Sequence, residues 1–136
     1  VYTSANAGKS WQLLVNFNRP QLVLDQLIID SRDSNVIYTS GHRHKEPGGF
    51  FKTTDGGLTW KESPHLKNES IHAMIQAEAD PNFLIVGTVT GLWFSNDSGD
   101  TWKKVQSPSA PVTVNSLAVD PNDVNTIYAG TWWRAY

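Results

Sequence analysis

The octapeptide TTDGGLTW at residues 53–60 recurs at two other places in the chain. It returns as SNDSGDTW at residues 95–102 and, with weaker agreement, as SANAGKSW at residues 4–11. The shared pattern is hydroxyl, any residue, Asp or Asn, any residue, Gly, any residue, hydroxyl, Trp. The tryptophans that end the three copies are 49 and 42 residues apart, a period typical of repeat architectures. One period therefore corresponds to about one unit of four short strands.

The octapeptide has the chemistry of a turn. A short side chain such as Asp55 or Asp97 accepts hydrogen bonds from backbone N–H groups about two residues further on. The glycine two positions later takes a positive φ without a clash at Cβ, and the Thr-Trp pair that follows favours an extended chain. Each copy therefore predicts a hairpin turn, and because each acid recurs alone, we favour this over a metal site or a carboxylate pair. The residues expected to have this structural role are Asn6, Gly8, Trp11, Asp55, Gly57, Trp60, Asp97, Gly99 and Trp102.

The composition excludes several classes of protein. The 136 residues are 39% hydrophobic, 11% aromatic and 18% charged, which is typical of one folded domain. The formal net charge of -2 comes from charges spread along the chain, so we expect neither a nucleic acid nor a membrane as a partner. The chain has no cysteine, which excludes disulfides and thiolate metal sites. Because the first residues already belong to a repeat, we expect the chain to begin inside a longer natural sequence.

The hydrophobic pattern predicts an all-β protein. Short alternating or β-branched runs bounded by Gly, Pro, Asn and Asp recur throughout, whereas no long segment keeps the apolar spacing of a helix. The closest internal match pairs LIIDSRDSNVIYTSG at residues 27–41 with LAVDPNDVNTIYAGT at residues 117–131. These two segments are 90 residues apart, which corresponds to two periods of the repeat.

Four-stranded antiparallel units that cannot bury both faces alone pack around a central axis in β-propellers. We name the strands of one unit A to D, so that the octapeptide joins C to D and a polar turn joins A to B. We predict a single propeller segment of about three blade equivalents, with incomplete first and last blades. It comprises strands C and D of one blade at residues 1–16, a full blade at 22–62, another at 70–105, and strands A, B and the start of C at 112–136.

A closed propeller needs about four to eight blades, so one copy of this chain would leave two blade faces exposed. Joined end to end, the two termini read TWWRAYVYTSANAGKSW, which is similar in length to GTVTGLWFSNDSGDTW at residues 87–102. The N-terminal strands C and D could therefore complete the C-terminal strands A and B. We expect either a homo-oligomer, in which two copies supply about six blades, or a fragment that packs on the remaining blades of a parent propeller.

The repeated S/T-x-D-x-G-x-T-W pattern and the strand sequence LAVDPNDVNTIYAGT resemble the Asp-box (BNR) repeat β-propellers. That group includes sialidases, sortilin-type receptors, xyloglucanases and the photosystem II assembly-factor family. The resemblance covers essentially the whole chain and implies the propeller fold. It also implies that the box is a structural staple away from the ligand site, and it favours an extracytoplasmic location.

The loops at the end opposite the boxes are where we expect a ligand to bind. In an antiparallel blade the A–B and C–D turns share one end, and the B–C loops lie at the other. The three B–C loops differ, being HRHKEPGG at residues 42–49, VTG at 89–91 and TWWRA at 131–135. Variable loops on a repeated scaffold commonly carry binding residues. The candidate ligand-binding residues are Trp132, Trp133, Arg134, His42, Arg43 and His44.

Two interpretations of the adjacent Trp132 and Trp133 remain open. Neighbouring residues of an extended segment point to opposite faces, so one could pack between blades while the other forms an exposed platform for a sugar or a protein. Alternatively, both are buried at blade contacts, as tryptophans usually are.

The pair His42 and His44 could hold a metal if Glu46 or His72 supplied a third ligand. Short His-x-His pairs are more commonly solvated loop residues, so we expect no metal and no cofactor. Arg43 and Lys45 could instead attract an anionic ligand.

No catalytic signature is visible. A sialidase-like site would need clustered arginines with a Tyr and Glu pair, but the arginines of this chain stand at dissimilar positions. A xyloglucanase-type site would need two carboxylates across a cleft, and the acids form no distinctive pair. We therefore predict no catalytic residue and favour a non-catalytic scaffold that binds a glycan or a protein, or directs assembly, through the B–C loop rim. The alternative is part of a glycoside hydrolase whose catalytic acids lie outside this chain or at a subunit junction.

Overall fold

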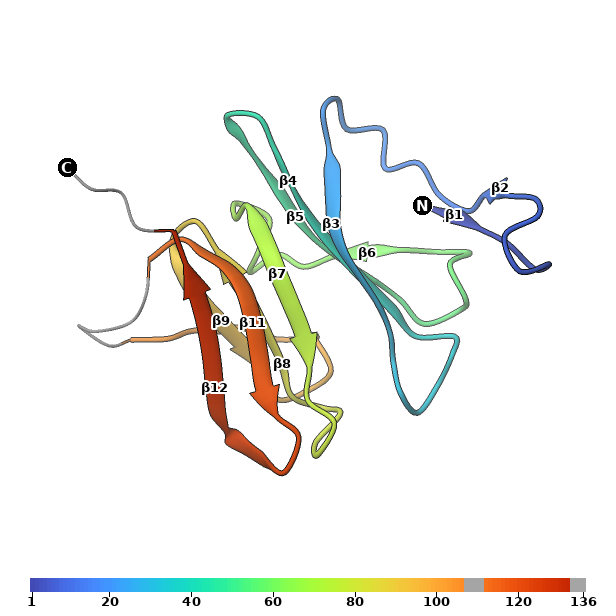
Figure 1. Ribbon diagram of the computed structural model, residues 1–136. Helices are drawn as coiled ribbons and strands as arrows, with labels where there is room; N and C mark the ends of the chain where they lie inside the picture. Colours follow the sequence, from blue (N-terminus) through green and yellow to red (C-terminus); the bar gives the residue numbers. More distant parts are fainter. Residues whose placement is uncertain (107–111, 133–136) are drawn as a thin grey trace.

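The computed structural model describes residues 1–106 and 112–132. Within these residues all regular secondary structure is β-strand, and every strand pairing is antiparallel. The all-β prediction is therefore confirmed. The strands form two four-stranded sheets flanked by two two-stranded sheets (Figure 1). The described part of the chain contains no helix that is long and apolar enough to cross a membrane.

Each sheet is a meander in which consecutive strands are neighbours. The two complete blades are β3 (Val23–Ile29), β4 (Ile37–Arg43), β5 (Glu46–Thr53) and β6 (Lys61–Glu62), followed by β7 (Ile71–Gln76), β8 (Leu84–Thr88), β9 (Gly91–Ser95) and β10 (Lys103–Lys104). The flanking pairs are β1 (Tyr2–Thr3) with β2 (Gln12–Leu13), and β11 (Val114–Asp120) with β12 (Asp123–Thr131). With the four consecutive strands of a blade named A to D, β1 and β2 correspond to strands C and D of an incomplete blade. β11 and β12 correspond to strands A and B of another.

The three octapeptides close their turns with a common set of hydrogen bonds, with one difference in the first copy. In the second copy the Thr53 hydroxyl donates to Asp55 Oδ1 at 2.7 Å and accepts from the Gly57 N–H at 3.0 Å. Asp55 accepts from both the N–H and the hydroxyl of Thr59, at 2.9 and 2.6 Å. The indole N–H of Trp60 donates to the Gly57 carbonyl at 3.0 Å. Equivalent bonds join Ser95, Asp97, Gly99, Thr101 and Trp102. They also join Ser4, Asn6, Gly8, Ser10 and Trp11, except that the Asn6 amide donates to the Ser10 hydroxyl.

The span of the turn differs from the sequence-based expectation. The Asp55 carboxylate accepts from the backbone N–H four residues on, at Thr59, rather than about two residues on. A hydrogen bond that spans two residues is made in the other direction, from the Asp55 N–H to the Thr53 hydroxyl at 3.3 Å. The box is therefore a wider loop with two bonded side chains, and Gly57 has a positive φ of 94° at its end.

The burial of each box tryptophan depends on whether a preceding blade packs against it. Trp102 is buried and meets Phe50 of the preceding blade edge to face, with ring centroids 5.0 Å apart. Trp60 is half-buried and contacts Phe17, which lies in the segment before β3. Trp11 is 63% exposed. The tryptophan thus becomes a packing anchor where another blade is present to receive it.

The two complete blades share the main apolar core. Its buried members come from both sheets and from the link between them: Tyr38, Phe50, Leu66, Ile71, Met74, Leu84, Val86 and Trp102. A second cluster, Ile85, Leu92 and Val114, joins the second complete blade to β11. Burial of apolar surface at these two junctions is the main source of stability in the fold.

A polar cluster lies beside the main core and ties the same two blades together. The buried Asp30 side chain accepts hydrogen bonds from Arg32, from the Tyr38 hydroxyl at 2.9 Å and from Gln76 of β7 at 2.8 Å. Arg32 also donates to Asn82 of the second complete blade at 2.7 Å. The Arg32 hydrogen bond, followed by those of Tyr38 and Gln76, holds the pKa of Asp30 well below its usual range.

Each outer face of the segment is partly uncovered. Tyr38 and Tyr128 stand at corresponding positions of strand B, yet Tyr38 is fully buried and Tyr128 is 63% exposed. On β3, Val23, Leu27 and Ile29 are about half exposed. The expected exposure of two blade faces is therefore present in the structure, and it occurs where a sheet has no complete neighbour.

Strand A contains a β-bulge near its start in each of the three blades in which it is described. The pairing register shifts between Leu24 and Gln26 in β3, between Ile71 and Ala73 in β7, and between Val114 and Ser116 in β11. The residues at the three bulges are Asp25, His72 and Asn115. Gly41 of β4 lies against the first bulge, since a Cβ atom there would be 2.0 Å from the Val23 carbonyl oxygen. A bulge redirects the side chain that it carries, so these three positions are geometrically distinct from the rest of strand A.

We predict that replacing Asp97 affects stability through the turn. Asp97→Ala should lower the free energy of unfolding by about 1 kcal/mol, because the loop loses its acceptor. Asp97→Asn should cost less, because Asn6 closes the first box through its amide oxygen, which accepts from the Ser10 N–H at 2.9 Å. Urea denaturation at pH 7 measures both, and an equal loss for the two variants would contradict this account.

The pH dependence of the same variants gives a second measurement. Partial desolvation would raise the pKa of Asp97, but the hydrogen bonds from Thr101 and Ser95 outweigh it and lower the pKa from 3.8 to about 2. The stabilisation is therefore complete above about pH 4 and is lost as the pH falls to about 2. The difference in stability between the wild type and Asp97→Asn should shrink over this range.

We also predict that Gly41→Ala is strongly destabilising. The new methyl group would overlap backbone atoms of the bulge, so β3 must shift, at a cost of about 1–3 kcal/mol. Gly130→Ala is the matched control, because its Cβ would meet only the Ser116 hydroxyl, which can rotate away. Urea denaturation of the two variants should show the larger loss for Gly41→Ala, and the reverse order would refute the prediction.

Candidate functional site

The B–C turns gather at the end of the molecule opposite the A–B turns. In Figure 1 the tip of the β4–β5 hairpin, the β8–β9 turn and the end of β12 point upward, whereas the β3–β4, β7–β8 and β11–β12 turns point downward. The Thr113 hydroxyl donates to the Val89 carbonyl at 3.3 Å, and the Trp132 N–H donates to the Thr113 carbonyl at 3.2 Å. We call the end that carries the B–C turns the upper rim.

The predicted loop at residues 42–49 was wrong in its extent. β4 continues to Arg43 and β5 begins at Glu46, so only two residues turn the chain. The extra length is held by the pairing of Arg43 with Glu46 and by their ion pair, in which the guanidinium and carboxylate are 2.7 Å apart. Arg43 Nε also donates to the Pro47 carbonyl at 2.8 Å. A paired hairpin thus takes the place of the predicted loop on the upper rim.

An open cavity of about 400 Å³ lies on the upper rim between the two complete blades. It is lined by the β4–β5 hairpin on one side and by Ser70, His72 and Val89 on the other. Its wall contains imidazole, guanidinium, ammonium and carboxylate groups close together. Such a mixture suits a polar or charged ligand better than an apolar one.

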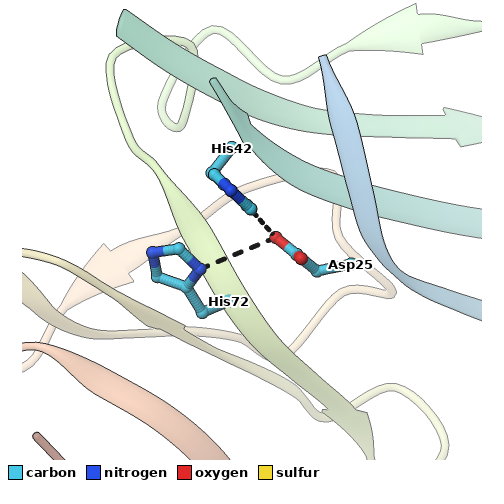
Figure 2. A group of neighbouring side chains, drawn as sticks. All are labelled: Asp25, His42 and His72. Atoms are coloured by element: carbon cyan, nitrogen blue, oxygen red, sulfur yellow. Dashed lines mark hydrogen bonds and ion pairs between the residues drawn. The ribbon is translucent and has the colours of Figure 1, made fainter. Parts of the chain in front are cut away.

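Three side chains converge, as Figure 2 shows: Asp25 from β3, His42 from β4 and His72 from β7. His42 and His72 also line the cavity. Nδ1 of His42 lies 2.5 Å from Oδ2 of Asp25, which makes a short hydrogen bond. Nδ1 of His72 lies 3.6 Å from the same oxygen. The two imidazole rings are 4.7 Å apart between centroids. All three side chains are partly accessible to solvent, with 21–31% of each exposed.

The bulges explain why these residues meet. Asp25 and His72 are the bulge residues of two successive blades, so both occupy the redirected position at the start of strand A. His42 is paired with Val23 near the same end of β4, two residues from the first bulge. The cluster is thus built from ordered strands of two blades.

The other carboxylates of the upper rim are bonded to neighbouring side chains. Glu62 makes two hydrogen bonds to the Arg19 guanidinium, at 2.9 and 2.6 Å. The buried Glu69 accepts from the Thr90 hydroxyl with both oxygens, at 3.0 and 2.8 Å. Their hydrogen-bonding capacity is used to hold strands and links in place.

The candidate ligand-binding residues fall into three groups. His42 is part of the convergent cluster, whereas His44 is exposed at the tip of the hairpin and Arg43 is paired with Glu46. Trp132 is 63% exposed, next to the end of β12. Trp133 and Arg134 lie outside the described residues.

Sequence reasoning did not single out Asp25. Its one signal was an acidic residue inside the otherwise apolar run LVLDQLII at residues 22–29. The structure also places His72, and not His44, beside His42. The two-residue spacing of His42 and His44 thus did not identify the neighbours of His42, which are set by the packing of one blade on the next.

Comparison with known proteins shows similarity to much longer chains. Vacuolar protein sorting/targeting protein 10 of Clavispora lusitaniae is 33% identical over 94 residues, which cover 60% of this chain and 5% of that protein. Xyloglucanase Xgh74A of Acetivibrio thermocellus is 29% identical over 129 residues, which cover 83% of this chain and 15% of that protein. No protein-family model matches the chain. The chain therefore spans only a small part of the length of the curated relatives it matches.

Solved structures show the same arrangement of blades. An ancestral GH74 enzyme matches with a TM-score of 0.77 and 24% identity, over 95% of this chain and 18% of that chain. The GH74 xyloglucanase from Xanthomonas campestris matches with a TM-score of 0.76 and 21% identity, over 96% and 22% of the two chains. YCF48 bound to D1 peptide matches with a TM-score of 0.52 and 14% identity, over 71% and 31%. These neighbours show that the chain has a β-propeller fold, and its three boxes resemble those of the Asp-box (BNR) repeat propellers.

Proposed function

We propose that this chain is a non-catalytic segment of an Asp-box propeller that binds a glycan or a protein at its upper rim. The observation that carries the proposal is a separation of roles between the two ends of the blades. The repeated acids Asp55 and Asp97 are bonded within their own turns. The side chains that differ between blades line the open cavity at the other end.

Trp132 favours a glycan as the ligand. Its indole is largely exposed at the upper rim, and its backbone is tied through Thr113 to Val89, which lines the cavity. An exposed aromatic face offers a large apolar surface of the kind on which a sugar ring can stack. The matches to xyloglucanases make xyloglucan fragments the first ligands to test. The match to YCF48 bound to a peptide supports a protein ligand as the second.

The carboxylates of the upper rim support a role in binding rather than hydrolysis. A glycosidase needs one carboxylic acid to protonate the leaving group and a second carboxylate on the other side of the bond. Among the described residues of the cavity wall, Glu46 is paired with Arg43. Asp25 accepts from His42, and Glu62 is held by Arg19. Each of these acids has a partner from the chain itself.

The alternative is that the chain is part of a glycoside hydrolase. The fold similarity to two GH74 enzymes, at TM-scores of 0.77 and 0.76, favours it. In this case the catalytic acids belong to other blades or to a subunit junction, and this segment contributes to the substrate cleft.

We further propose that additional blades cover the two exposed faces, with a second copy of the chain as one source. The exposed surfaces include Tyr128 at one end and Trp11 at the other, and their counterparts Tyr38 and Trp102 are buried at a blade junction. The same residue types are therefore buried wherever a neighbouring blade is present. Pairing of β1 of one copy with β12 of another would join strands C and D to strands A and B.

We predict that Trp132→Ala weakens binding of xyloglucan oligosaccharides by about tenfold, because the stacking surface is lost. Trp11→Ala is the matched control, since Trp11 is also 63% exposed but belongs to a box. Isothermal titration calorimetry measures binding, and a reducing-sugar assay should detect no turnover. Hydrolysis that disappears when a single acid is replaced would overturn the non-catalytic proposal in favour of the alternative.

We predict that the isolated chain associates in solution, because association would bury the exposed apolar faces. Light scattering should give a mass above the 15.1 kDa of one chain. A well-folded monomer of 15.1 kDa would rule out a second copy as the source of the missing blades.

A further inference from the structure

We propose that Asp25, His42 and His72 bind a divalent transition metal ion, such as Zn²⁺, at the junction of the two complete blades. The three residues each offer one ligand atom, and these atoms all lie within 4.8 Å of one another. Figure 2 shows that the side chains point toward one another from β3, β4 and β7. This site goes beyond the proposed binding of a glycan or a protein and does not depend on it.

The distances suit a small rearrangement into a metal site. Ligand atoms about 2.1 Å from a tetrahedral Zn²⁺ are about 3.4 Å from one another. Asp25 Oδ2 and His72 Nδ1 are already 3.6 Å apart. Asp25 Oδ2 and His42 Nδ1, at 2.5 Å, share a proton in a hydrogen bond. A metal ion takes the place of that proton, which passes to Nε2 of a neutral His42 or to solvent from a protonated one, and the two atoms move apart by roughly 1 Å to admit the ion.

The donor set selects the class of metal. Two imidazole nitrogens with one carboxylate oxygen suit Zn²⁺, Co²⁺ and Ni²⁺, whereas Mg²⁺ and Ca²⁺ prefer all-oxygen sites. The Asp25 carboxylate supplies negative charge against the ion. The positive charge of nearby Arg43 is offset by its ion pair with Glu46.

Three protein ligands leave one position of a tetrahedral ion open. His42 and His72 both line the 400 Å³ cavity, so solvent can reach the site. A structural zinc site usually has four protein ligands, whereas a site with an open position exchanges its fourth ligand. The bound ion would therefore present a water molecule, or an anionic or carbonyl group of a ligand, at the upper rim.

The next blade junction shows what the site requires. The positions that correspond to Asp25, His42 and His72 are there occupied by His72, Val89 and Asn115. Valine has no ligand atom, so the same fold does not produce a second site of this composition. The metal site is thus a property of three particular side chains and not of the propeller scaffold.

The test is a titration of the whole chain, prepared without a polyhistidine tag, with ZnCl₂. Isothermal titration calorimetry should give one Zn²⁺ per chain, and Co²⁺ should give the visible absorption of a tetrahedral nitrogen and oxygen site. His42→Ala and His72→Ala should each weaken Zn²⁺ binding at least tenfold. His44→Ala is the matched control, because His44 is exposed on the same hairpin but lies outside the cluster.

Thermal melting separates loss of ligands from loss of folding. Because the ligands come from two blades, Zn²⁺ should raise the melting temperature of the wild type and of His44→Ala. It should not raise that of His42→Ala or Asp25→Asn, whose melting without metal shows whether they fold. The proposal is overturned if Zn²⁺ does not bind at one per chain, if Ca²⁺ binds as tightly, or if His44→Ala weakens binding as much as His42→Ala. These outcomes are independent of whether xyloglucan binds.

Discussion

A four-stranded antiparallel blade has two faces, and burial of both requires a neighbouring blade on each side. This constraint explains the distribution of exposed apolar side chains in the structure. Tyr38 is fully buried where a complete blade follows it, whereas Tyr128, at the corresponding position, is 63% exposed. The box tryptophans follow the same rule, because Trp102 packs on Phe50 of the preceding blade and Trp11 is solvent-exposed. Stability in this architecture is a property of junctions between blades more than of blades.

The Asp box has a local role within that constraint. Its hydroxyl, acid, glycine and tryptophan bond to one another and close the turn between strands C and D. The Gly56 N–H also donates to the Asn35 carbonyl, which ties the box to the A–B turn of the same blade. The first box makes the equivalent bonds with Asn6 in place of an acid. The geometry therefore needs an oxygen acceptor at this position, not a negative charge. Because the repeated hydroxyl, acid and tryptophan bond to one another within each box, the recurrence of the motif along the chain marks the number and order of the blades.

Most of the architecture was predictable from the sequence because it depends on local, repeated signals. The spacing of the boxes and the alternating apolar runs predict antiparallel blades, and the structure confirms that fold class. The extent of the β4–β5 hairpin was missed, because Gly48 and Gly49 resemble a loop in sequence although Gly49 pairs with Gly41 in the sheet. The cluster of Asp25, His42 and His72 depends on register shifts in two strands and on the packing of two blades. The two histidines are 30 residues apart, so the sequence could name His72 only as one of two possible third ligands and could not place it beside His42.

The bulge at the start of strand A connects the repeated scaffold to chemistry that is not repeated. It recurs in β3, β7 and β11, so the backbone offers the same redirected position at every junction. What occupies that position differs, being Asp25, His72 and Asn115 in turn. A substitution there changes the chemistry of the upper rim without disturbing the box or the apolar core. The repeated bonds of the boxes thus lie at one end of each blade, whereas the side chains at the other end differ from blade to blade. A polar cluster formed at one junction and absent from the next is the expected consequence of that arrangement.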